Sequence, residues 1–363
     1  MPPQVELTER LPGAAWFSGV LADRLVEVSD DLAVLDRRGW WAVVITFEGV
    51  VRLYRFARRR AMSLPAAKGR WRGPGPGEWT SSLDGAQYRA GVREIRRRIR
   101  EGEVYQVNLC RVLSAPITPD DDPWALARLL AHGNPAPYAG VIDVPDGPGR
   151  PGTRLVTASP ELFLSRRGDL VTSSPIKGTA ETEAGLLPKD RAENVMIVDL
   201  VRNDLQRVCM PGSVEVSSLL EVQQHPGLVH LVSTVQGRLG HAGWAGMLAA
   251  TSPPGSVSGA PKSSALRAIA DLEPVPRGPY CGAVGWVDAD RDLGRLAVGI
   301  RTFWWEAGSL RFGTGAGITW GSDPDGEWDE TLLKARHLVA LAGGHEQAGD
   351  RHGKEAPGWL EWV

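Results

Sequence analysis

Short apolar runs separated by turns fill residues 13–57 and predict β-strands. The run WWAVVITFEG begins at Trp40, and the run VVRLYRF begins at Val50. Runs of this length, rich in β-branched and aromatic residues, are typical of strands. Residues 64–83 then hold several glycines and prolines, which indicates a long loop or linker. We place the main boundary of the chain in this stretch.

Beyond the linker the apolar residues change to a helical period, which predicts a helix that starts near Asp84 and ends before Gly102. Strands and helices are then mixed without a regular alternation, so the predicted fold class is α+β. Further helices are expected at 124–132, 189–208, 261–272 and 325–341. Further strands are expected in VYQVNLCRVL, in a hairpin that turns at 167–169, in LVHLVSTVQGRL, and at 281–287, 296–304 and 309–314.

Charge and cysteine content exclude several classes of function. The net charge of the 363 residues is −2, so no strong attraction to nucleic acid is expected. Cys110, Cys209 and Cys281 are an odd, widely spaced set that fits neither a disulfide framework nor a metal motif. Without a secretory start or an apolar run of about 18 residues, we expect a cytoplasmic protein with no membrane contact.

Carboxylates on two of the predicted helices are candidate ligands for a hard cation. Glu327, Glu330 and Lys334 share one helix face, because they are three and four residues apart. A solvated surface helix is the more common explanation of such a face. The helix at 189–208 adds Glu193, Asp199 and Asp204. If both helices face one cavity, a site of carboxylates without His or Cys suits Mg²⁺.

Two glycine-rich loops and one glutamate are further candidates. The loop PPGSVSGAPK precedes a helix, and RFGTGAGITWGS follows a strand, so backbone N–H groups of either loop could hold an anion. Arg301 and Lys334 could bind substrate carboxylates near them. Glu161 follows a Ser-Pro turn and precedes an apolar strand, where a carboxyl group can keep a proton and act as an acid. Taken alone, each glycine loop is better explained by tight turns, and most glutamates that follow a turn are merely exposed.

No cysteine lies in a glutaminase nucleophile motif, and no phosphate-loop or dinucleotide fingerprint is present. A series of segments does stand out, namely GEVYQVNLCR, SPELFL, PIKGT, KDRAENVMIVDLVRNDL, VHLVSTVQGRL, PPGSVSGAPK, CGAVGW, AVGIRT, GTGAGI and EWDETLLKA. These segments occur in the order seen in the chorismate-utilising enzymes, and the chain resembles that family from about Tyr88 to Leu341. The resemblance is strongest to aminodeoxychorismate synthases.

The resemblance implies a Mg²⁺-dependent enzyme with two packed, mostly antiparallel sheets and helices outside. Residues 1–83 would be a shortened N-terminal segment that adds strands to the sheets, residues 84–345 the chorismate-binding catalytic domain, and residues 346–363 a tail. The tryptophan site that many relatives have in the N-terminal part is not carried over. The implied roles are Glu193, Glu327 and Glu330 for the metal; Arg301, Lys334 and the backbone of Gly315, Ala316 and Gly317 for substrate carboxylates; Thr179 for a substrate contact; Glu161 as the acid; and His230 near the reacting ring.

Lys177 in PIKGT decides the expected reaction. In the aminodeoxychorismate synthases that this segment resembles, the lysine attacks carbon 2 of the chorismate ring and expels the 4-hydroxyl, and ammonia then attacks carbon 4. A nucleophilic lysine must be neutral, and proton transfer to Glu161 would free the amine and arm the acid together. Gln106 stands where isochorismate-forming relatives have a lysine base, which disfavours water as the nucleophile.

The missing glutaminase motif implies a separate glutamine amidotransferase partner, or the use of free ammonia. Three alternatives stay open: an anthranilate synthase, a 2-amino-2-deoxyisochorismate synthase, or a non-catalytic subunit that only binds an amidotransferase. The product would serve 4-aminobenzoate and folate synthesis or a secondary-metabolite pathway. Ala180, Pro254 and Ala316 depart from residues common in the family, and the methyl group of Ala316 would narrow a carboxylate pocket built from backbone.

Overall fold

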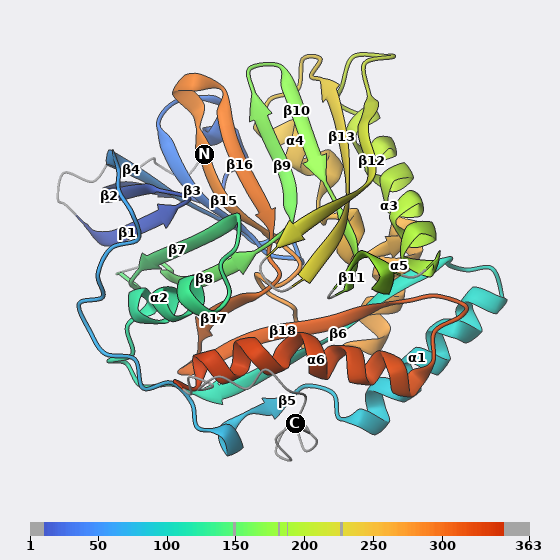
Figure 1. The fold of residues 1–363 in the computed structure, drawn as a ribbon. Coiled ribbons are helices and arrows are strands. Elements are labelled where there is room, and N and C mark those ends of the chain that lie inside the picture. The colour runs from blue at the N-terminus through green and yellow to red at the C-terminus, as the bar shows by residue number, and fades with distance from the viewer. Residues whose placement is uncertain (1–10, 148–149, 181, 187, 226–227, 345–363) are drawn as a thin grey trace.

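The computed structural model describes residues 11–147, 150–180, 182–186, 188–225 and 228–344. The six α-helices in these residues lie outside a large sheet (Figure 1). They are α1 (Gly85–Arg100), α2 (Pro123–Gly133), α3 (Pro188–Gln206), α4 (Trp244–Thr251), α5 (Lys262–Leu272) and α6 (Pro324–Ala342). The predicted tail 346–363 lies outside the described residues.

The strands of the described residues are hydrogen-bonded into one continuous sheet, and the pairs within it are antiparallel. The predicted α+β class with mostly antiparallel strands is therefore confirmed, and the two expected sheets are joined to each other by strand pairing. The strands are β1 (Leu11–Phe17), β2 (Val20–Ser29), β3 (Trp40–Ile45), β4 (Val51–Ala61), β5 (Thr80–Ser81), β6 (Gln106–Pro116), β7 (Tyr138–Val144), β8 (Thr153–Ser159), β9 (Leu162–Arg167), β10 (Leu170–Ser174), β11 (Ile176–Ala180), β12 (Glu215–His225), β13 (Leu228–Arg238), β14 (Gly259–Ala260), β15 (Ala283–Asp288), β16 (Leu293–Val298), β17 (Thr302–Glu306) and β18 (Ser309–Ile318).

Strands from the first 61 residues belong to this sheet. β1 pairs with β7, and β3 pairs with β15, although each partner lies far along the chain. All six residues of β3 are buried, which explains the continuous apolar run at this point. The N-terminal strands and the later part of the chain therefore share one hydrophobic core.

Local sequence signals place the helices that carry the site. At the start of α1, the side chain of Asp84 accepts from the backbone N–H of Gln87, and the Gln87 side chain accepts from the N–H of Asp84. This reciprocal capping stabilises the predicted start. α6 begins after Asp323, whose side chain accepts from the N–H of Gly326. It packs along β18, while α3 packs on β13 (Figure 1).

The expected strand 296–304 is wrong, because β16 ends at Val298 and β17 begins at Thr302. A Cβ atom on Gly299 would lie 2.0 Å from the carbonyl oxygen of Pro279, so the backbone makes a close approach that a regular strand would not allow. Arg301 follows with a φ of 51°, in the left-handed region. The break therefore turns the arginine out of the strand direction.

The elements β7, β12 and α4 and the two-residue strands β5 and β14 were not expected from the sequence. Pro261 caps α5 and is not its first helical residue. No helix within the described ranges is long and apolar enough to cross a membrane.

Candidate active site

Lys177 lies in β11, and its side chain is half-buried. Its Nζ atom donates a hydrogen bond to the carbonyl oxygen of Ser256, at 3.1 Å. The next residue, Gly178, has a φ of 78°, and a Cβ atom there would lie 2.8 Å from Cβ of Asp190 in α3. The glycine of PIKGT therefore allows α3 to approach the strand that carries the lysine.

Glu161 lies in the turn between β8 and β9 and is 4% exposed. Burial raises the pKa of its carboxyl group to about 7, although a hydrogen bond from the Ser256 side chain and the charge of Lys177 both act to lower it. Among the described residues, no donor lies within hydrogen-bond distance of its buried Oε1 atom. A carboxyl group with a pKa of about 7 can accept a proton from a neighbouring group and donate it to a bound molecule near neutral pH.

Ser256 connects these two groups, since its carbonyl oxygen contacts Lys177 and its hydroxyl contacts Glu161. It is 5% exposed and lies in the short 3₁₀ turn Gly255–Val257. Sequence analysis quoted this loop for its backbone N–H groups and missed the side chain of Ser256. The lysine and the acid, far apart in the chain, are thus brought to one place.

The raised pKa of Glu161 predicts a measurable pH dependence of stability. The ordinary pKa is 4.5 and the folded value is about 7, so between these values the folded protein keeps a proton that the unfolded chain has lost. The free energy of unfolding therefore falls as the pH rises through this window. Glu161→Gln removes the cost of ionising the buried carboxyl group. In urea titrations, its stability relative to the wild type should increase by about 2 kcal/mol from pH 5 to pH 8. A difference that does not change with pH would contradict the raised pKa.

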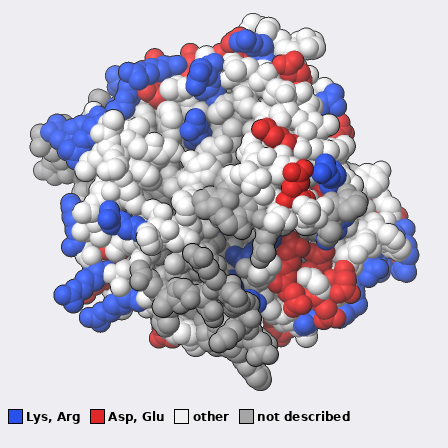
Figure 2. All heavy atoms as spheres, in the orientation of Figure 1, with Lys and Arg blue, Asp and Glu red and all other residues white. Residues whose placement is uncertain are grey.

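Acidic side chains gather over the N-terminal end of α6 (Figure 2), where this helix carries Glu327 and Glu330. Lys334 pairs with Glu330 at 2.6 Å and donates to the carbonyl oxygen of Gly315 at 3.2 Å. Burial raises the pKa of Glu327, and the negative charge of Glu330 adds to this effect. Burial also opposes ionisation of Glu330, but Lys334 outweighs it and lowers the pKa of that residue.

Glu193 of α3 faces the same group of charges. Burial raises its pKa, with a further contribution from Glu330 that Lys177 and Lys189 partly offset. Within the described ranges, no three His, Cys, Asp or Glu side chains are close enough together to hold a metal ion. Glu193, Glu327 and Glu330 therefore influence one another electrostatically without forming a ready-made ligand shell.

The other two carboxylates of α3 do not face this group. Asp199 is exposed and pairs with Arg202 at 3.2 Å. Asp204 is buried and pairs with Lys262 at 2.5 Å. The expectation that these two carboxylates could join a shared metal site is wrong, because each pairs with a basic side chain. Spacing along a helix does not reveal such partners.

The Asp204–Lys262 pair joins α3 to the start of α5, and Lys262 also donates to the carbonyl oxygen of Thr251. It thereby fixes both ends of the loop that contains Ser256. Lys262→Met should lower the free energy of unfolding by about 3 kcal/mol, because it leaves Asp204 buried without a counter-charge. Denaturant unfolding at pH 7 checks this, with the exposed pair residue Arg202→Met as the control that should change stability by less than about 1 kcal/mol. Equal effects of the two variants would contradict a structural role for the buried pair.

Arg301 is the candidate ligand for a second substrate carboxylate. Burial lowers its pKa, and no carboxylate contributes to that shift. One of its Nη atoms lies 3.5 Å from Oδ1 of Asn134, whose buried Nδ2 has no hydrogen-bond partner among the described residues. The two side chains thus offer donors to an anion, and Asn134 is a second residue that sequence analysis missed.

The backbone expected to hold carboxylates lies in β18. A Cβ atom on Gly315 would lie 2.6 Å from Sγ of Cys110, and one on Gly317 would lie 2.4 Å from Nε2 of Gln106 and 3.5 Å from Nζ of Lys177. Neither position has room for a side chain, so the two glycines let this face of β18 approach Cys110 and Gln106 closely beside the lysine. Ala316 points to the opposite face and is fully buried in a hydrophobic cluster. The expectation that its methyl group narrows a carboxylate pocket is wrong, since strand residues alternate between faces.

His230 is buried in β13, and its backbone pairs with that of Thr179 in β11. The expected ring-side residue and the expected substrate contact are thus neighbours in the sheet. The side chain of Thr179 lies outside the described part of the structure. The family model for chorismate-binding enzymes matches residues 55–340.

The chain belongs to the chorismate-binding enzymes. It is 37% identical to anthranilate synthase component 1 of Streptomyces coelicolor over 91% of the chain and 69% of that relative. It is 38% identical to aminodeoxychorismate synthase component 1 of Klebsiella aerogenes over 72% of the chain. The match spans 59% of the length of the Klebsiella protein.

Solved structures show the same fold for this chorismate-binding enzyme. The isochorismate synthase DhbC of Bacillus anthracis has a TM-score of 0.77 at 25% identity, over 91% of this chain and 96% of that one. Anthranilate synthase component I of Streptococcus pneumoniae has a TM-score of 0.74 at 24% identity, over 93% of both chains. The anthranilate and aminodeoxychorismate relatives match at nearly equal identity, so the residues of the site must discriminate between the reactions.

Proposed function

We propose that this enzyme aminates chorismate at carbon 4 and forms 4-amino-4-deoxychorismate. The observation that carries the proposal is the placement of the Lys177 amine and the Glu161 carboxyl group on the same residue, Ser256. An amine nucleophile beside a protonated acid is what replacement of a ring hydroxyl through a covalent intermediate requires.

In the proposed reaction, the neutral amine of Lys177 attacks carbon 2 of the ring. Both conjugated ring double bonds shift, the bond between carbon 4 and its hydroxyl breaks, and Glu161 supplies the proton with which the hydroxyl leaves as water. Ammonia then attacks carbon 4, both double bonds shift back, and the bond between carbon 2 and Lys177 breaks, which releases the neutral amine. The new ammonium group returns a proton to Glu161, so one water has left, one ammonia has entered, and both side chains are restored. Transfer of a proton from Lys177 to Glu161 prepares both groups before the first step.

The acidic group fits Mg²⁺ in the chemistry of its donors. Glu193, Glu327 and Glu330 supply only oxygen ligands. Burial raises the pKa of Glu193 and Glu327, and a bound cation would offset the cost of keeping these buried carboxylates ionised. These three side chains would hold the ion, whose charge would bind and neutralise the ring carboxylate. Arg301 and Asn134 would take the other carboxylate, with the backbone of Gly315 and Gly317 beside it.

Ammonia would come from a separate glutamine amidotransferase subunit or from solution. The relatives from Streptomyces coelicolor and Klebsiella aerogenes are both named component 1, which supports a two-component assembly. The proposal also includes a cytoplasmic location. The product would serve 4-aminobenzoate and folate synthesis or a secondary-metabolite pathway.

Amination at carbon 2 is the second candidate, as in an anthranilate synthase or a 2-amino-2-deoxyisochorismate synthase. It is favoured by the Streptomyces coelicolor relative, which matches 91% of the chain. A non-catalytic amidotransferase-binding subunit is a weaker third candidate, because the proposed acid, nucleophile and metal ligands are all present.

The deciding experiment is a product assay with purified protein, chorismate, Mg²⁺ and an ammonium salt at mildly alkaline pH, resolved by chromatography and mass. Amination at carbon 4 gives a product that an added lyase converts to 4-aminobenzoate. Anthranilate or its non-aromatised precursor would replace the proposal by the second candidate. Binding of chorismate without any turnover, also in the presence of an amidotransferase, would favour the third.

A further inference from the structure

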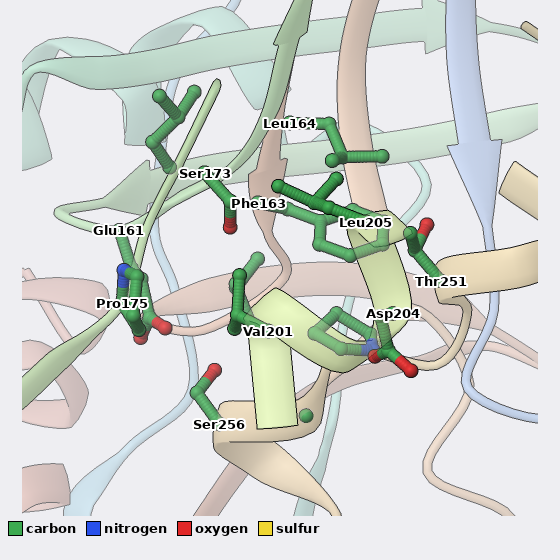
Figure 3. Close-up of a pocket in the computed structure, with 14 residues that line it drawn as sticks. Glu161, Phe163, Leu164, Ser173, Pro175, Val201, Asp204, Leu205, Thr251 and Ser256 are labelled. Carbon is green, nitrogen blue, oxygen red and sulfur yellow. The ribbon is translucent and has the colours of Figure 1, made fainter. Parts of the chain in front are cut away.

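A narrow cavity lies directly behind Glu161, on the side of α3 (Figure 3). The volume of the cavity that is open to the centre of a water-sized molecule is about 10 Å³. This is room for one such molecule. Glu161 and Ser256 line one end, and Asp204 and Thr251 line the other. Most of the remaining wall is apolar, with Leu162, Phe163, Leu164, Pro175, Val201 and Leu205.

An open groove of about 550 Å³ lies on the other side of α3. α3 contributes Met196, Asp199, Leu200 and Asn203 to this groove, whereas Val201, Asp204 and Leu205 line the inner cavity. Ala260 and Pro261 close the groove from the side of the loop that also carries Ser256. The same helix and the same loop therefore separate the surface groove from the space behind the acid.

At Leu200, a single side chain separates the outer groove from the inner cavity; we call this wall the partition. A Cβ atom on Gly255 would lie 2.8 Å from Cδ2 of Leu200, so this leucine packs directly on the glycine backbone. Leu200 lines the outer groove, and Gly255 lines the inner cavity. Leu200 is half-buried, so its side chain is the group that stands between the two spaces.

We propose that ammonia enters through this route, from the groove past Leu200 and Gly255 into the cavity behind Glu161. This inference rests on the proposed function, because it concerns the nitrogen source of that reaction. Ammonia is neutral and close to water in size, so it fits the cavity. An ammonium ion would lose its hydration in the mainly apolar passage at a large cost, so the route selects the form of nitrogen that can attack carbon.

The inner end of the route lies where ammonia is needed. Glu161 protonates the hydroxyl that leaves carbon 4, so the space behind its carboxyl group adjoins the carbon that ammonia attacks next. Lys177 contacts Ser256 from β11, and Ser256 also lines the cavity. The Asp204–Lys262 pair, which joins α3 to α5, holds the two sides of the passage together.

The test varies the thickness of the partition and measures the apparent KM for ammonia at saturating chorismate, with initial rates over a series of ammonium concentrations. Leu200→Trp fills the gap and should raise this KM at least about 10-fold while the KM for chorismate stays within about 2-fold. Leu200→Ala opens the gap and should give a KM for ammonia at or below that of the wild type. Val195→Trp places the same ring on an exposed position of α3 that lines neither the groove nor the cavity, and it should leave both values unchanged.

Several outcomes would overturn the route. It is refuted if Leu200→Trp matches the wild type, if Leu200→Trp raises the KM for chorismate as much as that for ammonia, or if Val195→Trp raises the KM for ammonia equally. Leu200→Phe is the milder second variant, should the tryptophan variant fail to fold, and must show the same selective change. If the wild type aminates chorismate and these variants have no effect, only the route is contradicted. A wild-type protein that incorporates no ammonia contradicts the proposed function and the route together.

Discussion

Lys177→Ala should lower the rate of ammonia-dependent formation of 4-amino-4-deoxychorismate by at least about 10³-fold, because it removes the nucleophile that expels the 4-hydroxyl. Lys177→Arg is the matched control, since it keeps a positive charge near Glu161 and Glu193 but has no amine that can attack. Both variants should lose activity to a similar extent, while binding of chorismate, measured by calorimetry, should persist in the arginine variant.

A covalent intermediate gives this prediction a second measurement. Wild-type protein mixed with chorismate and Mg²⁺ in the absence of ammonia should gain the mass of chorismate less one water, and the added mass should map to the peptide that contains Lys177. Neither variant should carry it. If Lys177→Ala aminates chorismate at the wild-type rate, the lysine is not the nucleophile, and direct attack of ammonia at carbon 2 becomes the better explanation.

Glu161→Gln should lower kcat by about 10²–10⁴-fold, the usual range for the loss of a general acid. The amide has the shape of the carboxyl group and leaves the hydrogen bond with Ser256 in place, so the KM for chorismate should change little. In the wild type, kcat/KM should increase as the pH rises through about 7, because Glu161, with its raised pKa of about 7, must lose its own proton before it can accept the proton of Lys177. The residual activity of Glu161→Gln should lack this increase.

Glu161→Asp separates the acid from its position. The shorter side chain keeps an ionisable group but withdraws it from the ring, so activity should be intermediate between the wild type and the glutamine variant. A glutamine variant with wild-type activity and an unchanged pH profile would assign the proton transfer to another group.

Five of the six α-helices in the described residues, all except α4, could be predicted from the sequence because their signals are local. The start of α1 depends on Asp84 and Gln87, which are three residues apart, and that of α6 depends on Asp323 and the following proline. The break between β16 and β17 could not be predicted, since it follows from the contact of Gly299 with the backbone of Pro279, twenty residues earlier. A periodic apolar pattern contains no information about such an approach.

The site residues also divide into those that local motifs indicate and those that only the fold brings together. The motifs indicated Lys177 and Glu161, and the structure brings both to Ser256. Helical spacing grouped Glu193 with Asp204, but Asp204 pairs with Lys262 from another element. Strand alternation, applied to Gly315 and its neighbours, would have placed Ala316 in the core. Asn134 could not have been found, because only the fold brings it to Arg301.

The long pairing of β6 with β18 has a consequence for the synthesis of the protein. β6 is complete at Pro116, but its partner begins only at Ser309, and α6, which carries Glu327 and Glu330, follows it. Contacts so distant along the chain make folding slow, because the intervening loop must close before pairing can stabilise it. The nascent chain therefore leaves the ribosome with most of its strands made and the edge of β6 still exposed. During that interval the exposed edge of β6 can pair with another chain, and a chain truncated before residue 309 would keep that edge exposed.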